Sequence, residues 1–194
     1  MKNLLTELRV ALIATLSLAV LLCGIYPVMV WVVAQGLFPA EAKGSLIMRG
    51  GKIAGSDLIG QGFTDAKYFH PRPSAAGSGY DAVSSGGSNL GPTSKRLADA
   101  VKQRVLDYRA ENGLAPDVLV PADAVTASAG GLDPHISLKN AYLQAPRVAK
   151  ARELSEKTVL RELVHFTEDR DLGILGEARV NVLKLNIALD GILR

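Results

Sequence analysis

Three histidines are the residues of this sequence best suited to acid–base or metal chemistry, and they lie far apart. They stand at positions 70, 135 and 165. No two of them have the spacing of four residues that places paired metal ligands on one helix face. No serine stands in the G-x-S-x-G setting of a nucleophile elbow. The sequence therefore predicts neither a catalytic residue nor a metal site. A hydrolase that assembles serine and histidine from distant segments stays open as an alternative.

A glycine-rich segment, residues 84–93, is the nearest approach to a nucleotide site. Its sequence, SSGGSNLGPT, has the first-to-second glycine spacing of a phosphate-binding loop, but proline follows where that loop needs lysine. A helix is expected directly afterwards, and an anion could bind at its N-terminus. The weak candidates for cofactor binding are Gly86, Gly87, Ser88 and Asn89. A direct nucleotide-binding module is therefore the second alternative function.

Two short segments with prolines carry the residues best suited to binding a partner. In residues 69–74, FHPRPS, two prolines hold the chain extended and restrict where Arg72 can reach. A guanidinium held in this way suits a carboxylate or carbonyl on a partner, and the alternative is a stiff loop with a solvated arginine. In residues 132–137, LDPHIS, Asp133 and His135 either belong to a binding surface or form a turn that leads into a helix.

A long uncharged segment near the start of the chain is a candidate membrane helix, and it would hold all of these residues close to a membrane. After Lys2, Glu7 and Arg9, a run of 31 residues contains no Asp, Glu, Lys, Arg or His. A hydrocarbon layer of about 30 Å needs roughly 20 helical residues, so this run can cross it as a helix. A cleaved secretory signal is the alternative, although the apolar stretch is too long and no A-x-A site follows closely. We expect a membrane anchor.

The charges that flank this helix predict its direction. Lys2, Arg9 and the amino terminus outweigh Glu7, so the start of the chain should stay in the cytoplasm of a bacterium. The expected parts are a cytoplasmic tail (1–9), a transmembrane helix (10–34), a linker (35–44) and a periplasmic domain (45–194). The chain is thus expected to be a single-pass protein of the inner membrane.

The composition of the exported domain limits its partners. The one cysteine, Cys23, lies in the membrane helix, which leaves the domain without a disulfide or a cysteine metal site. After residue 40, 20 basic residues face 18 acidic ones, and no run carries one sign. This balance argues against nucleic acid as a partner.

The first half of the domain is predicted to hold a hairpin, a long loop and a helix. In residues 45–60, apolar pairs flank a Gly-Gly pair that supplies the positive φ angles of a tight turn. Residues 61–93 lack regular structure, but four aromatic residues indicate an ordered loop. A helix then begins at Thr93 or Ser94 and closes at Asn112-Gly113. Its apolar stripe consists of Leu97, Val101, Val105 and Tyr108.

The second half of the domain is predicted to be mostly helical. A connection rich in proline and alanine, residues 115–133, leads to a helix that Ser137 caps, with Pro146 as a defect. Ser155 caps another helix, whose apolar side consists of Val159, Leu160, Leu163 and Val164. Residues 180–193 fit a strand and a helix equally well. The expected fold class is α+β, with one transmembrane helix followed by a single mixed domain.

Seven segments of the domain form an ordered series that covers nearly the whole chain after the helix. They are GSDLIGQ (55–61), YFHPRPSA (68–75), GGSNLGPT (86–93), VPADAVTAS (120–128), GLDPHIS (131–137), PRVAKAR (146–152) and LGEARVNVL (175–183). Together with the N-terminal helix, they resemble the KdpC subunit of the bacterial Kdp potassium-transporting ATPase. Ala178 stands where that family has proline, which concerns a turn more than function.

The resemblance implies a non-catalytic accessory subunit of a high-affinity potassium uptake complex. The implied partners are a channel-like potassium-translocating subunit, a P-type ATPase subunit, membrane lipid and, as a further candidate, a small single-helix subunit. The family is described as a catalytic chaperone that raises the ATP affinity of the ATPase subunit through a ternary complex. Potassium is then the ion that the partner carries. The candidate interface residues are Arg72, Pro73, Ser74, Asn89, Asp133, His135, Arg147, Arg179 and Asn181.

Overall fold

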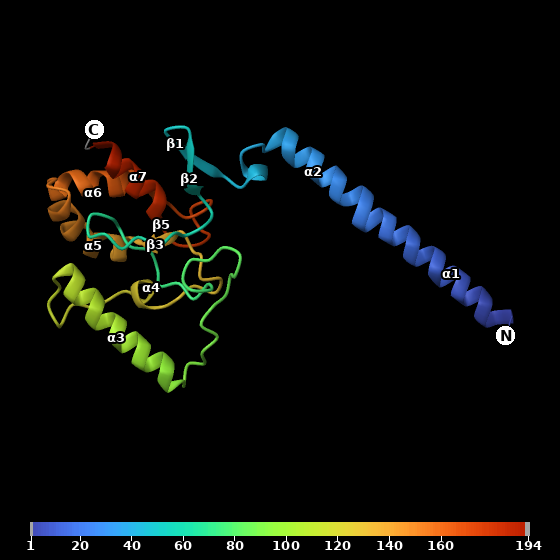
Figure 1. Cartoon of the computed structure of the whole chain (residues 1–194), viewed down its shortest axis with the longest axis horizontal. Coiled ribbons are helices and arrows are strands. Elements are labelled where there is room, and N and C mark those ends of the chain that lie inside the picture. Colours follow the sequence, from blue (N-terminus) through green and yellow to red (C-terminus); the bar gives the residue numbers. More distant parts are fainter. Residues whose placement is uncertain (1, 193–194) are drawn as a thin grey trace. The chain divides into compact units, whose positions relative to one another are not determined.

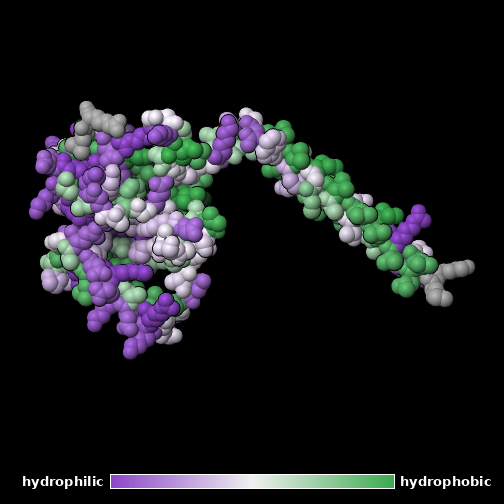
Figure 2. Space-filling model, viewed as in Figure 1, coloured by the Kyte–Doolittle hydropathy of each residue, from purple (hydrophilic) through white to green (hydrophobic). Residues whose placement is uncertain are grey.

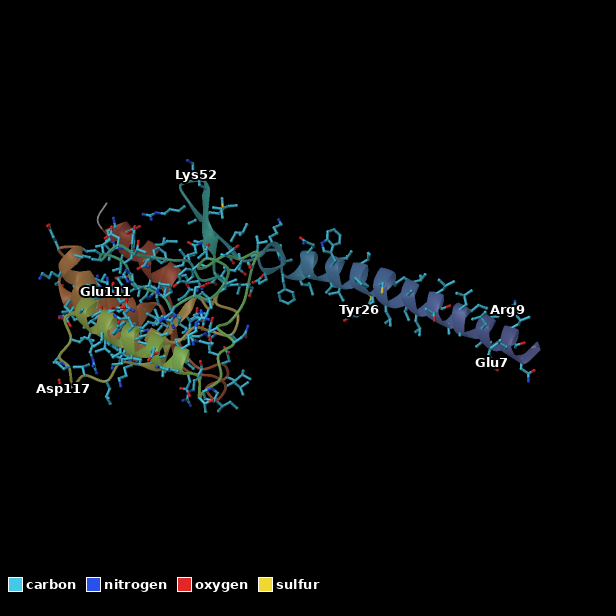
Figure 3. The ribbon with its side chains drawn as sticks, turned by 60° about the horizontal axis from the view of Figure 1, so that its bottom comes forward. Glu7, Arg9, Tyr26, Lys52, Glu111 and Asp117 are labelled. Atoms are coloured by element: carbon cyan, nitrogen blue, oxygen red, sulfur yellow. The ribbon has the colours of Figure 1, made fainter. Side chains whose placement is uncertain are left out.

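The computed structural model describes residues 2–192, and the chain divides into two compact units between Leu46 and Ile47 (Figure 1). The first unit is helical: α1 (Lys2–Ala19) continues through a π-helical segment (Val20–Ile25) into α2 (Tyr26–Leu37). The stretch Asn3–Leu37 is long and apolar enough to cross a membrane. Figure 2 shows its apolar surface, and Figure 3 places Glu7 and Arg9 close to one end.

Pro27 gives a physical reason for the π-helical segment. A proline in a helix lacks the amide hydrogen for the carbonyl four residues earlier, and its ring crowds that carbonyl. Widening the preceding turn at Val20–Ile25 relieves the crowding. The helix continues to Leu37, past the predicted boundary at residue 34, and a 3-10 turn (Glu41–Lys43) follows.

The second unit begins with the predicted hairpin. Strands β1 (Leu46–Arg49) and β2 (Lys52–Ser56) form a two-stranded sheet. Gly50 and Gly51 between them have φ angles of 57° and 77°, a left-handed region that glycine adopts without steric cost. Lys52 projects from the hairpin in Figure 3.

A small antiparallel sheet, ordered β3-β5-β4, lies among the helices of this unit. Its strands are β3 (His135–Ser137), β4 (Thr167–Glu168) and β5 (Arg179–Asn181). The helices are α3 (Lys95–Asn112), α4 (Ala122–Val125), α5 (Leu138–Ala151), α6 (Glu156–His165) and α7 (Val182–Ile192). In Figure 1, α3 lies on one side of β3 and β5, and α6 and α7 lie on the other. The predicted α+β fold class is confirmed.

Serine side chains begin three of these helices, as predicted. Ser94, Ser137 and Ser155 each accept a hydrogen bond from the backbone amide three residues later. Pro146 lies inside α5 without ending it. In the ambiguous segment 180–193, the first two residues belong to β5 and residues 182–192 form α7, while residue 193 lies outside the described residues. One face prediction is wrong, because Val164 is exposed while Val159 is fully buried.

The hydrophobic core lies where α5, α6 and α7 meet the sheet. Its fully or nearly fully buried members include Phe69, Ile136, Val148, Val159, Leu163, Val180, Leu185 and Leu189. The predicted ordered loop, residues 61–93, contributes Phe69 to this core. Asn186 of α7 accepts from the Phe69 amide (2.8 Å) and donates to its carbonyl (2.9 Å). Gln144 of α5 makes the same pair of bonds with His70, at 2.7 and 3.0 Å. Two helices thereby fix the loop.

Candidate functional site: a charged surface cleft

A surface cleft of about 410 Å³ lies beside β3 and the segment that leads into β5. It is lined by Arg72, Asp123, Asp133, His135, Ile136, Ser137, Glu177, Ala178 and Arg179. Four of the predicted interface residues therefore share one cleft: Arg72, Asp133, His135 and Arg179. They come from three segments that are far apart in the sequence, so only the folded domain brings them together.

Asp133 organises one half of the cleft. Its Oδ2 lies 3.0 Å from Nη1 of Arg72, and its Oδ1 accepts a 3.0 Å hydrogen bond from the His135 amide. Nη2 of Arg72 also faces the carbonyls of Thr126 and Ala127, at 3.5 and 3.4 Å. Arg72 is therefore not a solvated loop residue, because its guanidinium joins three segments of the chain. Asp133 also accepts from a local backbone amide, as in the turn that was one of the two alternatives for residues 132–137.

Glu168 organises the other half. Its Oε2 lies 3.4 Å from Nε2 of His135 and 3.1 Å from Nε of Arg179. Its Oε1 lies 3.5 Å from Nζ of Lys184, which also contacts Oδ2 of Asp57 at 2.6 Å. The register of the sheet explains this arrangement, because Glu168 on β4 stands opposite Arg179 on β5. Glu168 thus contacts two basic side chains, Arg179 and Lys184, and His135 lies between it and Asp133.

The contacts around Asp133 change its acidity. Burial acts to raise the pKa of this carboxyl group. Hydrogen bonds from the His135 ring and amide, together with the Arg72 guanidinium, outweigh burial and lower the pKa to about 2. Asp133 therefore carries its negative charge at neutral pH.

Ser74 and Pro73 lie next to the cleft but serve the loop itself. Oγ of Ser74 donates to the Gly131 carbonyl (2.7 Å) and accepts from the amides of Ala76 (3.2 Å) and Tyr80 (2.8 Å). Pro73 is half-buried beside it. Gly131 has a φ of +68°, and a Cβ there would collide with the Ala76 amide. The structure therefore assigns Ser74 to holding two loops in close contact.

The glycine-rich segment packs against another backbone segment. The Gly86 amide donates to the Gly130 carbonyl at 3.1 Å. A Cβ on Gly87 would lie 2.7 Å from the carbonyl oxygen of Ala129. Ser88 and Asn89 are exposed, and Asn89 has a φ of 52°. Close packing between two loops accounts for Gly87, whereas a Cβ on Gly86 would meet no atom within 4 Å. The carbonyl oxygens nearby would repel a phosphate.

Arg147 and Asn181 do not line the cleft. Nη1 of Arg147 donates to the carbonyls of Ala66 (2.6 Å) and Tyr68 (3.0 Å), so α5 holds the start of the long loop. Asn181 is fully buried, and its Nδ2 donates to the carbonyl and the carboxylate of Asp57. Arg147 therefore fixes the long loop, and Asn181 fixes the segment around Asp57.

Sequence reasoning missed several charged residues of this site. Glu168, Lys184 and Asp57 were not predicted, although each contacts a charged neighbour there. Asp123 was also missed; it accepts from the amide and hydroxyl of Ser137, at 2.8 and 2.9 Å. Glu168 and Lys184 are single charged residues without a local pattern. Asp57 and Asp123 could have been found, because they lie in the segments GSDLIGQ and VPADAVTAS.

The arrangement is suited to binding by charge and not to bond-breaking chemistry. His70 faces Glu111 at 2.7 Å and the Asp65 carbonyl, whereas His135 faces Asp133 and Glu168. The serine–histidine hydrolase that was the alternative would instead need a serine hydroxyl beside an imidazole. Among residues 2–192, no group of three His, Cys, Asp or Glu side chains is placed to hold a metal ion. The cleft presents paired charges of both signs.

Comparison with known proteins gives one consistent result. The family described as KdpC: K+-transporting ATPase, c chain, matches residues 8–191. A relative in Nitratidesulfovibrio vulgaris named "Potassium-transporting ATPase KdpC subunit" is 55% identical over 192 residues, which are 97% of this chain and 96% of that protein. A protein of the same name in Mycobacterium bovis is 55% identical over 95% of this chain and 97% of its own length. Another in Gemmatimonas aurantiaca is 52% identical over 96% of this chain and 93% of its own length. With such a match from end to end, the chain belongs to the KdpC family.

Proposed function

We propose that this chain is the non-catalytic accessory subunit of a high-affinity, ATP-driven potassium uptake complex. It assembles or stabilises a channel-like potassium-translocating subunit and a P-type ATPase subunit, with a small single-helix subunit as a further partner. The match of nearly the whole chain to proteins named as subunits of a potassium-transporting ATPase carries this proposal. Potassium is then the ion that the channel-like partner subunit transports.

The two units of the chain divide this work. The apolar helix lies in the bacterial inner membrane with its N-terminus in the cytoplasm, and the second unit lies on the periplasmic side. The cleft between Arg72 and Arg179 contacts the exported surface of a partner. A cleft with fixed charges of both signs favours one orientation of a partner and rejects others, because a displaced partner meets like charge.

The same contact supports the role of a catalytic chaperone. The chain raises the ATP affinity of the ATPase subunit indirectly, by favouring the conformation of that subunit that binds ATP well. The use of the Gly86 amide within the chain favours this indirect route over a nucleotide held by the glycine-rich segment. An effector changes affinity in this way only through different contacts with the two conformations.

Substitution of Arg179 tests the proposal. Arg179→Gln removes a charge from the cleft, and Arg161→Gln removes an exposed arginine of α6 as a matched control. We expect Arg179→Gln to reduce recovery of the ATPase and channel-like subunits with the tagged full chain about tenfold, equivalent to about 1.4 kcal/mol. The KM for ATP of potassium-stimulated hydrolysis should rise in the same complexes.

The controls separate three outcomes. Circular dichroism of the detergent-solubilised chain must show the same fold for both variants. If Arg179→Gln recovers the partners as well as Arg161→Gln, the cleft is not the contact. If the unsubstituted chain recovers neither subunit, the proposed function itself is wrong.

A further inference from the structure

Three apolar side chains are largely exposed to solvent at one turn of the domain. The segment between β4 and β5 reaches a tip at residues 172–175, Leu-Gly-Ile-Leu, which we call the 172–175 tip. Leu172 is 88% exposed, Ile174 is 76% exposed and Leu175 is 56% exposed. Single exposed apolar residues are ordinary, but three within four residues mark a site that another surface covers.

The tip has a defined backbone. Asp171 and Leu175 exchange two backbone hydrogen bonds of 2.9 Å, and the Gly173 amide donates to the Arg170 carbonyl at 3.0 Å. Leu172 and Gly173 have φ angles of 55° and 75°, the left-handed pair typical of a tight hairpin turn. Asparagine or glycine suits the first of these positions better than leucine. Leucine therefore occupies this position although a positive φ angle is sterically unfavourable for it.

Ion pairs join the tip to the cleft. Nη2 of Arg170 lies 2.7 Å from Oε2 of Glu177, and Nη1 of Arg179 lies 3.8 Å from Oδ2 of Asp171. Glu177 and Arg179 also line the cleft. The tip is thus continuous with the surface already proposed as a contact. The ion pairs fix its conformation before any partner binds.

The rim of the tip is acidic. Residues 168–177 contain four acidic side chains, Glu168, Asp169, Asp171 and Glu177, and one basic side chain, Arg170. Arg179 and Lys184 pair with Asp171 and Glu168 from outside this segment, so the acidic side chains outnumber the basic ones by four to three. Such a rim repels anionic lipid headgroups, which attract basic segments. It complements basic side chains around an apolar pocket on a protein.

We propose that the 172–175 tip inserts into an apolar pocket with a basic rim on another subunit of the transport complex. This inference rests on the proposed function, and it adds the part of the chain that anchors the contact and the chemistry of the surface that receives it. Leu172 and Ile174 fill the pocket, while the acidic rim sets the orientation. Apolar anchors at the centre with charges around them are the usual anatomy of a protein interface.

The test uses the full chain in its complex. Leu172→Asn with Ile174→Thr removes both anchors and keeps the turn, because asparagine tolerates a positive φ. Leu119→Asn with Val83→Thr makes the same chemical change at two comparably exposed positions outside the tip. We expect the tip variant to lose partner subunits about 100-fold faster than the control from immobilised complexes, since two anchors of about 1.4 kcal/mol each correspond to that factor.

A second variant tests the rim. Asp169→Lys reverses one exposed charge, and it should speed dissociation about 3- to 10-fold at low salt and less at high salt. Dissociation of the tip variant at the control rate would overturn the inference. Flotation of the full chain with anionic phosphatidylglycerol vesicles that depends on Leu172 and Ile174 would also overturn it, in favour of lipid. Absence of partners from the unsubstituted complex would instead refute the proposed function.

Discussion

Two amide side chains, on Gln144 and Asn186, each bond both backbone polar groups of one residue in the long loop. A loop inside a domain must satisfy its buried amides and carbonyls without a neighbouring strand. Here a side-chain amide offers the donor and acceptor that a strand would offer. Gln144 is fixed in turn by Asn140, whose Oδ1 accepts from it at 2.9 Å. The sequence predicted that the loop is ordered, but not which polar residues order it.

Asp133 makes the stability of the domain sensitive to acid. Its folded pKa of about 2 lies below the usual value of 3.8, so its stabilising effect is complete above about pH 4 and is lost as the pH falls from 4 towards 2. Asp133→Asn should lower the free energy of unfolding by about 1–2 kcal/mol at pH 7 after allowance for solvent screening. The difference from the unsubstituted chain should shrink below pH 4.

Thermal melting of the full chain in detergent, followed by circular dichroism between pH 2 and pH 7, measures this difference. Asp117→Asn, a change at an exposed carboxylate, is the control. A constant difference for Asp133→Asn across this range would contradict the assigned pKa.

Helix ends were predictable because their signals are local. A serine and the amide three residues later lie within one turn, so Ser94, Ser137 and Ser155 could be identified without knowledge of the fold. The sheet was not predictable in the same way. Its strands have two or three residues, and β3 pairs with a strand more than 40 residues later. Such pairs leave no alternation to detect.

The same distinction explains the candidate cleft. Arg72, Asp133 and His135 stood out because prolines surround them, whereas Glu168 and Lys184 reach the cleft only through the sheet and α7. Arg147 was grouped with them from the family resemblance, yet it holds the long loop. Contacts between segments that are distant in the sequence determine the roles of these residues.

Ser155 offers a prediction at the scale of one helix. Its Oγ accepts from the Thr158 amide at 3.1 Å, so Ser155→Ala leaves a donor at the start of α6 without its cap. The free energy of unfolding should fall by about 1 kcal/mol, and Ser155→Gly should cost only about a few tenths of that. Chemical denaturation of the full chain in detergent measures both. Equal losses for the two variants would show that the side chain acts by something other than capping.

The orientation of the whole chain follows from few charges. Lys2 and Arg9 against Glu7 predict a cytoplasmic N-terminus, and therefore a periplasmic second unit. Alkaline phosphatase fused after the last residue should be active, because this enzyme folds only in the periplasm, and a cytoplasmic reporter at the same place should be inactive. Lys2→Glu with Arg9→Glu should reduce the phosphatase activity. The opposite pair of reporter activities would place the domain beside cytoplasmic ATP.

The position of α7 governs when the domain can complete its fold. This final helix contributes fully buried Leu185 and Leu189 to the core. Its Asn186 bonds Phe69, 117 positions earlier, and its Asp190 bonds Arg49, 141 positions earlier. Contacts so distant in sequence form late, because the loop between their partners must first close. An incomplete translation product lacks these contacts and leaves an apolar core open to proteases and chaperones. The second unit can therefore reach its native core only after α7 has been synthesised.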